Sequence, residues 1–358
     1  MKTRFLIFAA LFLTGLFAGC IEKKSFNVSM KIMPVNEFTI ASSGDMDDAA
    51  SIIRKRLINF GIPDEKIRME TSTRQISLSL AGIDTAGIDV IREIITVPGN
   101  LEFWETFENS ELIEYLVRVN QDLKSNNPGI DLKPWEPAKP DTLSDELQAL
   151  VQDDTAGTAA KEAFGKQNPL FGILIPQTNY DGTPRPSCLI GLCNLHDTSK
   201  VNSLFRLPSI RNLFPRNLKL MWSAKPYQYD ESNLYFELHA IKNSTISKQP
   251  ILSGRDITSA EVVETKSADV LIRFLMTGKG AETWRRMTAY NIDRCIAITI
   301  DGGVRTYPRV MNEIAGGKTE ITGNFSLAEA QGLAVIFNSE GLVLPLRLKI
   351  SDLNVQAK

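Results

Sequence analysis

Strand-type and helix-type hydrophobic patterns alternate along this chain, and this alternation limits the folds that it can adopt. Between residues 26 and 32 every second side chain is apolar, which is typical of a strand with one buried face. Residues 49–60 then carry apolar side chains at helical spacing, and Gly61 ends that helix. Because the two patterns are mixed in this way, the sequence predicts an α+β protein.

The N-terminal part of the chain arranges these patterns in a familiar order. Strand patterns follow over residues 66–71 and 74–80, a helix pattern ends near Val97, and a last strand pattern covers residues 100–107. The order strand, helix, strand, strand, helix, strand is typical of a ferredoxin-like sandwich, in which two helices cover one face of an antiparallel sheet. The sequence therefore predicts a ferredoxin-like subdomain over residues 20–119.

Composition divides the rest of the chain. Residues 120–167 are rich in Pro, Asp, Lys and Asn, which indicates an irregular linker or insertion. Trp135 in that segment either pins the loop to its own domain or contacts a partner. Strand and helix patterns then resume in a middle α+β region and in a further α+β subdomain with antiparallel strands. The predicted division of the whole chain is an N-terminal segment (1–19), the ferredoxin-like subdomain (20–119), the linker or insertion (120–167), the middle α+β region (168–249), the further α+β subdomain (250–350) and a tail (351–358).

The last α+β region carries turn and cap signals. Asp301 and Gly302 follow a strand pattern, and an Asp-Gly pair in that position predicts a tight hairpin turn. Ser326 and Glu329 have the spacing of a capping box, so we expect a helix to begin there. A strand over residues 342–350 is expected to close the region.

The motif Gly317-Lys318-Thr319 ends as a phosphate-binding loop ends, so a nucleotide site has to be considered. Such a loop needs another glycine five positions before its Gly-Lys pair, and that position is occupied by Asn312. The residues from Lys318 onward alternate as in a strand, whereas a phosphate loop opens a helix. The sequence therefore predicts a turn here and no nucleotide cofactor.

The charge balance argues against a nucleic-acid partner. The net charge of the chain is −2, and it becomes more negative if Lys2 and Arg4 leave with the N-terminal segment. No basic field is then available to hold phosphate groups. The remaining composition is that of an ordinary globular protein, with 43% hydrophobic and 23% charged residues.

The N-terminus has the features of a lipoprotein export signal. A basic start precedes an apolar run from Phe5 to about Phe17, which is too short to span a membrane comfortably. Two small residues then precede Cys20, and this ending resembles the lipobox of bacterial lipoproteins. We therefore expect a signal peptide over residues 1–19 and a lipid on Cys20. The alternative is an uncleaved anchor, or ordinary cleavage beside a chance cysteine.

Three other cysteines, Cys188, Cys193 and Cys295, matter because exported proteins can form disulfides. Cys188 and Cys193 lie in one predicted strand, roughly 16 Å apart and on opposite faces, so they cannot pair with each other. We expect all three to be small apolar core residues, and any disulfide among them stays undecided. No second Cys or His pair has zinc-ligand spacing, so no metal site is predicted.

The two histidines, His196 and His239, give little support for catalysis. Asp197 follows His196, but it is expected to serve as the N-cap of the helix that begins there. His239 is expected to point outward from its strand. No serine elbow, metal cluster or carboxylate pair with a recognisable spacing accompanies them, so the protein is not predicted to be an enzyme.

Several segments resemble, in order, one known family. The stretches "AASIIRKRLINFGIPDEKIRMETSTRQISLSLAGID" and "LEFWETFENSE", and the region from "LSGRDITSAEV" to "NFSLAEAQGLA", look like the large first periplasmic domain of SecD, a membrane subunit that assists protein export. The segments "NPLFGILIP", "DTSKVN" and "LFPRNLKLMWSAKP" are similar to the form of the family in which SecD and SecF are fused. The resemblance covers nearly all of residues 26–350.

This resemblance implies a base region of ferredoxin-like type and a head subdomain, here over residues 250–350. In the family the head contacts preprotein that emerges from the export channel. Family members begin with a transmembrane helix and continue into further membrane helices that couple them to the proton gradient. This chain instead begins with the lipoprotein signal and stops at Lys358. We therefore expect a domain that does not itself use the proton-motive force.

Two functions remain open on the sequence alone. The first is a lipid-anchored accessory of protein export, which binds unfolded, translocating or newly exported polypeptides, alone or beside the Sec translocon or a complete SecDF. The second is an envelope protein-binding module without a role in Sec export, because a fold does not fix a function. Both place the protein in the cell envelope, facing the periplasm, with inner or outer membrane undecided. Neither assigns a polypeptide-binding surface.

Overall fold

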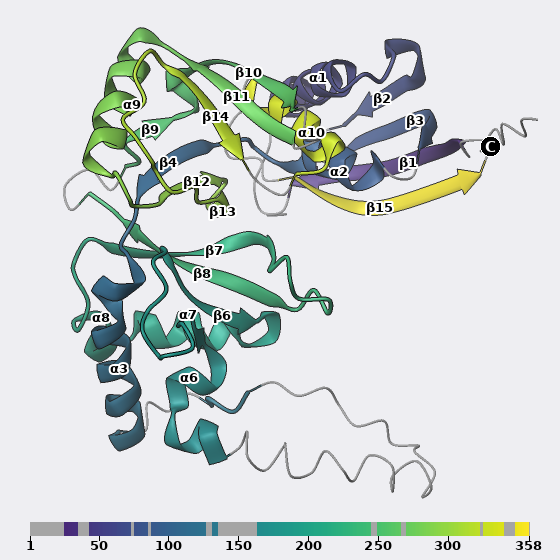
Figure 1. Cartoon of the computed structure of the whole chain (residues 1–358). Coiled ribbons are helices and arrows are strands. Elements are labelled where there is room, and N and C mark those ends of the chain that lie inside the picture. Colours follow the sequence, from purple (N-terminus) through teal and green to yellow (C-terminus); the bar gives the residue numbers. More distant parts are fainter. Residues whose placement is uncertain are drawn as a thin grey trace, which may run out of the picture.

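The structure of the protein is a computed structural model (Figure 1) that describes residues 25–34, 43–72, 75–84, 87–126, 131–134, 163–244, 249–265, 270–322, 325–339 and 348–357. Cys20 and Trp135 lie outside these residues. Three units can be distinguished: the base (residues 25–97 and 348–357), the middle unit (residues 106–244) and the head (residues 101–105 and 249–339). The predicted α+β class with antiparallel sheets is confirmed.

The base is a four-stranded antiparallel sheet that packs against two helices. Its elements are β1 (Ser25–Pro34), α1 (Ser43–Asn59), β2 (Ile67–Thr71), β3 (Ile76–Asp84), α2 (Ile88–Thr96) and β15 (Leu348–Ala357). The strand order is β15-β1-β3-β2, which is compatible with a ferredoxin-like sandwich. Ile32 and Ile76 of the strands share one buried core with Ile53 and Ile95 of the helices, because each element turns one apolar face inward.

The fourth strand of the base differs from the sequence prediction. The sequence predicts that residues 100–107 complete this sheet, but β4 (Leu101–Glu105) pairs with β12 (Ile296–Ile300) and β9 (Leu252–Ser253) in another sheet. β15 lies beside β1 instead and includes residues 351–357, which the sequence analysis assigned to a tail. A local hydrophobic pattern identifies a strand, but it does not specify the distant strand with which that strand pairs.

The head combines a three-stranded sheet, a hairpin and two helices. Its elements, besides β4, β9 and β12, are β10 (Ile257–Glu264), β11 (Val270–Met276), α9 (Gly278–Tyr290), β13 (Gly303–Thr306), β14 (Lys318–Thr322) and α10 (Leu327–Phe337). The β12–β13 turn has a φ of 50° at Asp301 and 84° at Gly302, so the predicted hairpin is confirmed. The capping box of Ser326 and Glu329 begins α10, as predicted.

The middle unit packs helices against a set of strands. Its elements are α3 (Asn109–Ser125), α6 (Pro169–Ile173), β5 (Ile175–Pro176), β6 (Leu189–Asn194), α7 (Thr198–Arg206), α8 (Pro208–Arg211), β7 (Leu218–Pro226) and β8 (Tyr235–Lys242). The irregular segment that the sequence predicts from residue 120 begins later, because α3 continues to Ser125. The sequence does carry a signal for this helix, because its buried residues recur at helical spacing: Leu112, Leu116, Val119 and Leu123.

One eight-stranded sheet joins the head to the middle unit and partly closes on itself. Its strand order is β5-β6-β8-β7-β13-β12-β4-β9. An isolated bridge between Thr106, directly after β4, and Ile241 of β8 connects two strands that the sheet otherwise keeps apart. The strands β8, β7, β13, β12 and β4 therefore form a ring, which we call the strand ring. Its interior holds one buried apolar cluster: Trp104, Met221, Ile241, Ala297 and Val304.

Candidate functional site

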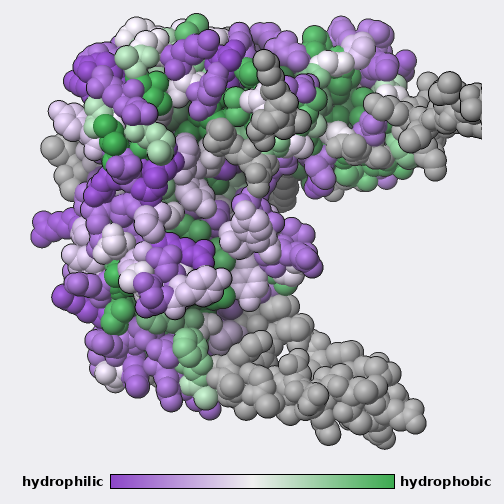
Figure 2. Space-filling view, in the orientation of Figure 1, coloured by the Kyte–Doolittle hydropathy of each residue, from purple (hydrophilic) through white to green (hydrophobic). Residues whose placement is uncertain are grey.

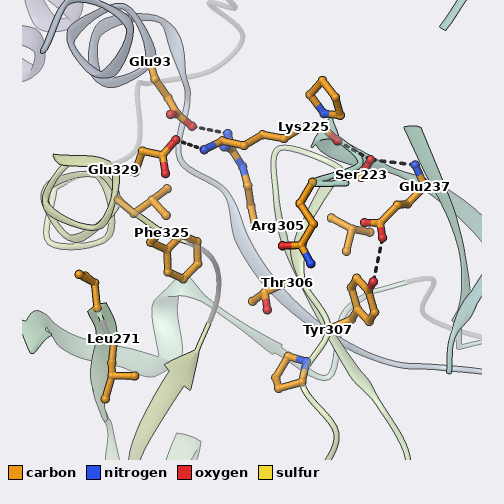
Figure 3. A pocket seen from close by; sticks show the side chains of 16 residues that line it. Glu93, Ser223, Lys225, Glu237, Leu271, Arg305, Thr306, Tyr307, Phe325 and Glu329 are labelled. Atoms are coloured by element: carbon orange, nitrogen blue, oxygen red, sulfur yellow. Dashed lines mark hydrogen bonds and ion pairs between the residues drawn. The ribbon is translucent and has the colours of Figure 1, made fainter. Parts of the chain in front are cut away.

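A pocket of about 560 Å³, which we call the junction pocket, lies where the base, the middle unit and the head meet (Figure 3). The face of the molecule seen in Figure 2 is mostly hydrophilic over the middle unit. The partly apolar pocket is therefore a better candidate for ligand binding than this open surface. Its polar lining residues are Glu93, Ser223, Lys225, Gln228, Glu237, Arg305, Thr306, Tyr307 and Glu329. Its apolar lining residues are Pro226, Val270, Leu271, Val304, Pro308, Phe325 and Leu333.

Two ion pairs cross the rim of the pocket and connect all three units. Arg305 of β13 pairs with Glu93 of α2, so the head is joined to the base. Lys225 of β7 pairs with Glu329 of α10, so the middle unit is joined to the head. Burial alone would raise the pKa of Glu329, but hydrogen bonds from Lys225 and the Ser326 backbone outweigh burial and lower this pKa.

Hydroxyl groups and one carboxylate line the side of the pocket next to the strand ring. The Tyr307 hydroxyl donates a hydrogen bond to Glu237 at 2.8 Å. Burial and the charge of Glu237 both raise the pKa of Tyr307, so the phenol stays neutral and acts as a donor. The Ser223 hydroxyl accepts from the Glu237 backbone N–H at 3.0 Å and donates to the Lys225 carbonyl at 2.6 Å.

The opposite side of the pocket is apolar. Val270 and Leu271 come from β11, Leu333 from α10, and Phe325 from the residues before α10. A ligand in this pocket would therefore meet an apolar wall on one side and hydrogen-bonding groups on the other. Among the described residues, no group of three His, Cys, Asp or Glu side chains could hold a metal ion. The lining is suited to an amphipathic ligand.

A cysteine, a histidine and a carboxylate do lie in line behind this pocket. The Cys188 Sγ atom is 3.7 Å from His239 Nδ1, and His239 Nε2 is 3.6 Å from Glu237 Oε2. This order matches a nucleophile, a base and an orienting acid. However, Cys188 and His239 are both fully buried, and burial raises the pKa of Cys188 well above its usual value. The sulfur therefore stays a thiol, which is a poor nucleophile.

The position of His239 corrects the sequence prediction, because the side chain points into the protein. β8 is covered on both faces: Leu238 and Ala240 pack in the core of the middle unit, while His239 and Ile241 face the strand ring. The outward prediction assumed a strand with one solvated face. His239 lies against the Tyr307 ring, with 4.5 Å between the ring centroids.

The other residues singled out in the sequence lie away from the pocket. His196 is exposed, and Asp197 occupies the N-cap position of α7, as predicted, although its side chain makes no capping hydrogen bond. Its carboxylate forms an ion pair with Lys200 at 2.8 Å, which competes with capping. Gly317 lies in a turn that leads into β14, so the predicted turn is confirmed.

The three cysteines in the described part of the chain are buried free thiols, as the core prediction requires. Cys193 is separated from the pocket, and burial raises its pKa to about 12. The pocket itself was not predictable from the sequence. Its lining comes from segments as distant as Glu93 and Glu329, and no local motif marks such a site.

The comparisons with known proteins point to one family. Residues 232–344 match the model of the SecDF P1 head subdomain. Protein translocase subunit SecD of Rhodothermus marinus is 28% identical over 307 residues, which are 83% of this chain and 44% of that protein. SecD of Acidaminococcus fermentans is 34% identical over 102 residues, or 28% of this chain and 24% of that protein. The chain thus spans less than half the length of these relatives.

Solved structures of SecDF also align with most of the chain. The crystal structure of SecDF in the Super-membrane-facing form aligns with 93% of this chain and 30% of its own, at 17% identity and a TM-score of 0.45. A structure of SecDF as a membrane component that enhances protein export aligns with 90% of this chain and 98% of its own, at a TM-score of 0.42. No helix in the described residues is long and apolar enough to cross a membrane. In sequence, the chain is therefore similar to SecD over most of its length, and residues 232–344 match the SecDF P1 head subdomain.

Proposed function

We propose that this domain assists protein export by binding translocating or newly exported polypeptides in the junction pocket, while a lipid on Cys20 holds it at a membrane. The relatives that it matches are named protein translocase subunits. The observation that carries the proposal is that residues 232–344, which match the P1 head, supply most of the pocket lining.

The lining of the pocket is suited to an extended polypeptide of variable sequence. Peptide N–H and C=O groups that leave water need hydrogen-bond partners, and polar side chains that include Glu237 and Tyr307 line one side of the pocket. Leu271 and Phe325 offer apolar surface to side chains on the other side. Binding of this kind is tolerant of sequence, because backbone groups are common to all polypeptides.

Weak binding is sufficient for this role. A lipid-anchored domain is confined close to the membrane where exported chains emerge, and confinement raises its effective concentration. A dissociation constant in the micromolar range or higher would then be enough. A micromolar constant corresponds to a binding free energy of about −8 kcal/mol. We further propose that the domain acts near the Sec translocon or a complete SecDF, and that it needs no nucleotide.

The experiment is site-specific photocrosslinking in cells that contain an export substrate arrested midway. Photoreactive residues are placed at Gln228 and Phe325 in the pocket and, as a control, at the exposed Arg68 of β2. We expect crosslinks to the arrested chain from both pocket positions and none from Arg68.

A different set of crosslinks would favour the alternative function. If Gln228 and Phe325 crosslinked only to one folded envelope protein, and not to the arrested chain or to Sec components, the domain would be a repurposed protein-binding module. Equal crosslinking from Arg68 and from the pocket would contradict the pocket as the binding site.

A further inference from the structure

Two cysteines from different units meet at the strand ring. Cys188 directly precedes β6 of the middle unit, and Cys295 directly precedes β12 of the head. The Cys188 carbonyl accepts from the Ala240 backbone N–H at 2.9 Å, and the Cys295 carbonyl accepts from the Thr106 hydroxyl at 2.6 Å. Thr106 forms the bridge to Ile241 that closes the ring, so ring closure brings the two cysteines together.

The two thiols lie beside each other where the strand ring closes, and their surroundings make them unequal. Burial raises the pKa of Cys188, whereas the interaction with Cys188 lowers the pKa of Cys295 to about 7. Cys295 is therefore the better nucleophile of the pair. The His239 Nδ1 atom lies 3.7 Å from the Cys188 sulfur.

We propose that Cys188 and Cys295 form a disulfide that links the middle unit to the head, made by exchange with a disulfide oxidant of the cell envelope. Disulfides persist in exported proteins, and the leader-like N-terminus predicts export. The cysteines are far apart in the sequence, so the bond closes a long loop, which is the case in which a crosslink restricts the unfolded chain most. Cys193 lies elsewhere and stays a thiol.

The exchange balances with a generic oxidant R–S–S–R. The Cys295 thiolate attacks one sulfur of the oxidant, a Cys295–S–S–R bond forms, and R–S⁻ leaves and takes up a proton. As folding brings Cys188 to Cys295, the still solvated Cys188 thiol gives its proton to water and attacks the Cys295 sulfur. This attack expels a second R–S⁻, which takes up a proton from water. Two protein thiols are oxidised and one oxidant disulfide is reduced to two thiols. Because both thiols are buried in the folded protein, the exchange takes place as the ring closes during folding.

The test maps disulfides in the full chain isolated from envelope fractions, and again after refolding with oxidised and reduced glutathione. Free thiols are alkylated under denaturing conditions, and the digested peptides are analysed by mass spectrometry before and after reduction. We expect one linked peptide pair that contains Cys188 and Cys295, with Cys193 alkylated. We also expect reduction to lower the melting temperature of the wild type.

Serine variants distinguish this crosslink from other oxidation. Cys193→Ser is the matched control, since it removes another buried cysteine, and it should keep the linked pair and the shift in melting temperature on reduction. Cys188→Ser and Cys295→Ser should each lose both. The proposal is overturned if both cysteines are fully alkylated after refolding with glutathione, or if the linked pair contains Cys193. The refolding result does not depend on export, so it separates this proposal from the proposed function.

Discussion

At the scale of single residues, a buried guanidinium ties the base to the head. Arg56 of α1 is fully buried and donates hydrogen bonds to the carbonyls of Ile94, Val97 and Pro98, and to the hydroxyl of Ser339. These acceptors belong to the ends of α2 and α10, where helix carbonyls lack partners within the helix. Burial lowers the pKa of Arg56 to about 10, which still leaves the side chain charged at neutral pH.

Replacing Arg56 should lower the free energy of unfolding more than replacing an arginine on the surface does. Arg56→Met keeps much of the side-chain volume but leaves buried carbonyls without donors, so we expect a loss of about 3 kcal/mol in the free energy of unfolding. Arg68→Met, on an exposed position of β2, should change it by less than about 0.5 kcal/mol. Denaturant unfolding of the three proteins measures both values, and equal effects would contradict the role assigned to Arg56.

An ion pair between α3 and the head should make stability depend on pH. Arg294 donates two hydrogen bonds of 2.9 Å to Glu111, and these lower the pKa of Glu111 below its usual 4.5. A lowered carboxyl pKa stabilises the fold above the usual value, and this stabilisation is lost as the pH falls through the pKa of the folded state. Both side chains are about one-third exposed, so solvent screening keeps the effect small.

Glu111→Gln should therefore be less stable than the wild type by up to about 1 kcal/mol at pH 7, and the difference should shrink at about pH 3. Unfolding curves at the two pH values measure it. Glu65→Gln, which makes the same substitution at an exposed position of the base, serves as the control. A difference that persists unaltered at low pH would show that Glu111 acts through packing and not through its charge.

At the scale of elements, the turn of the β12–β13 hairpin is hydrogen-bonded to the backbone just before β4. The Asp301 carboxylate accepts from the backbone N–H groups of Gly99 at 3.1 Å and Asn100 at 3.0 Å. The turn therefore holds the connection between the base and the head in place. This requires the left-handed conformation at Gly302, which residues with a side chain rarely adopt.

Gly302→Ala should destabilise the protein by about 1 kcal/mol. A Cβ atom at this position meets nothing within 4 Å, so the cost comes from the backbone alone. Gly278→Ala is the matched control, because its Cβ atom also meets open space while its φ is not positive, and it should be neutral or slightly stabilising. Thermal unfolding compares the two. Addition of ATP should leave the melting temperature unchanged, since the glycines near Lys318 are turn residues.

Features set by neighbouring residues were predictable from the sequence, and features set by distant pairing were not. The Asp301-Gly302 turn and the capping box of Ser326 were predictable because a few adjacent residues determine them. The partner of β1, the inward orientation of His239 and the whole of the junction pocket depend on strands that are far apart in the chain. Hydrophobic periodicity carries no information about such pairings.

At the scale of the whole molecule, three units share one pocket, and ion pairs between them hold its rim. Arg305 with Glu93 and Lys225 with Glu329 each join two units. The strand ring adds a second connection between the head and the middle unit. A polypeptide bound in the pocket would therefore contact all three units at once, so its binding would depend on their relative placement.

We predict that a lipid on Cys20 attaches the protein to a membrane. Cys20→Ser should release the protein from the membrane fraction or leave an unprocessed precursor, because the acyl chains that attach it can no longer be added. Fractionation followed by mass spectrometry of the N-terminus measures both outcomes. Cys193→Ser, which alters a buried core cysteine, should leave the membrane association unchanged. An unmodified N-terminus elsewhere in the wild type would contradict the lipid assignment.

The pairing of β1 with β15 has a consequence for the order in which the protein can be completed. β1 is the first described strand of the chain and β15 the last, yet they lie side by side in the base (Figure 1). A chain that crosses a membrane from its N-terminus presents β1 long before β15 emerges. One edge of β1 then stays unpaired in the base sheet until the middle unit and the head have crossed the membrane. If the protein is exported in this way, the domain would during that interval itself be an incompletely folded exported polypeptide, the class of molecule that we propose it binds.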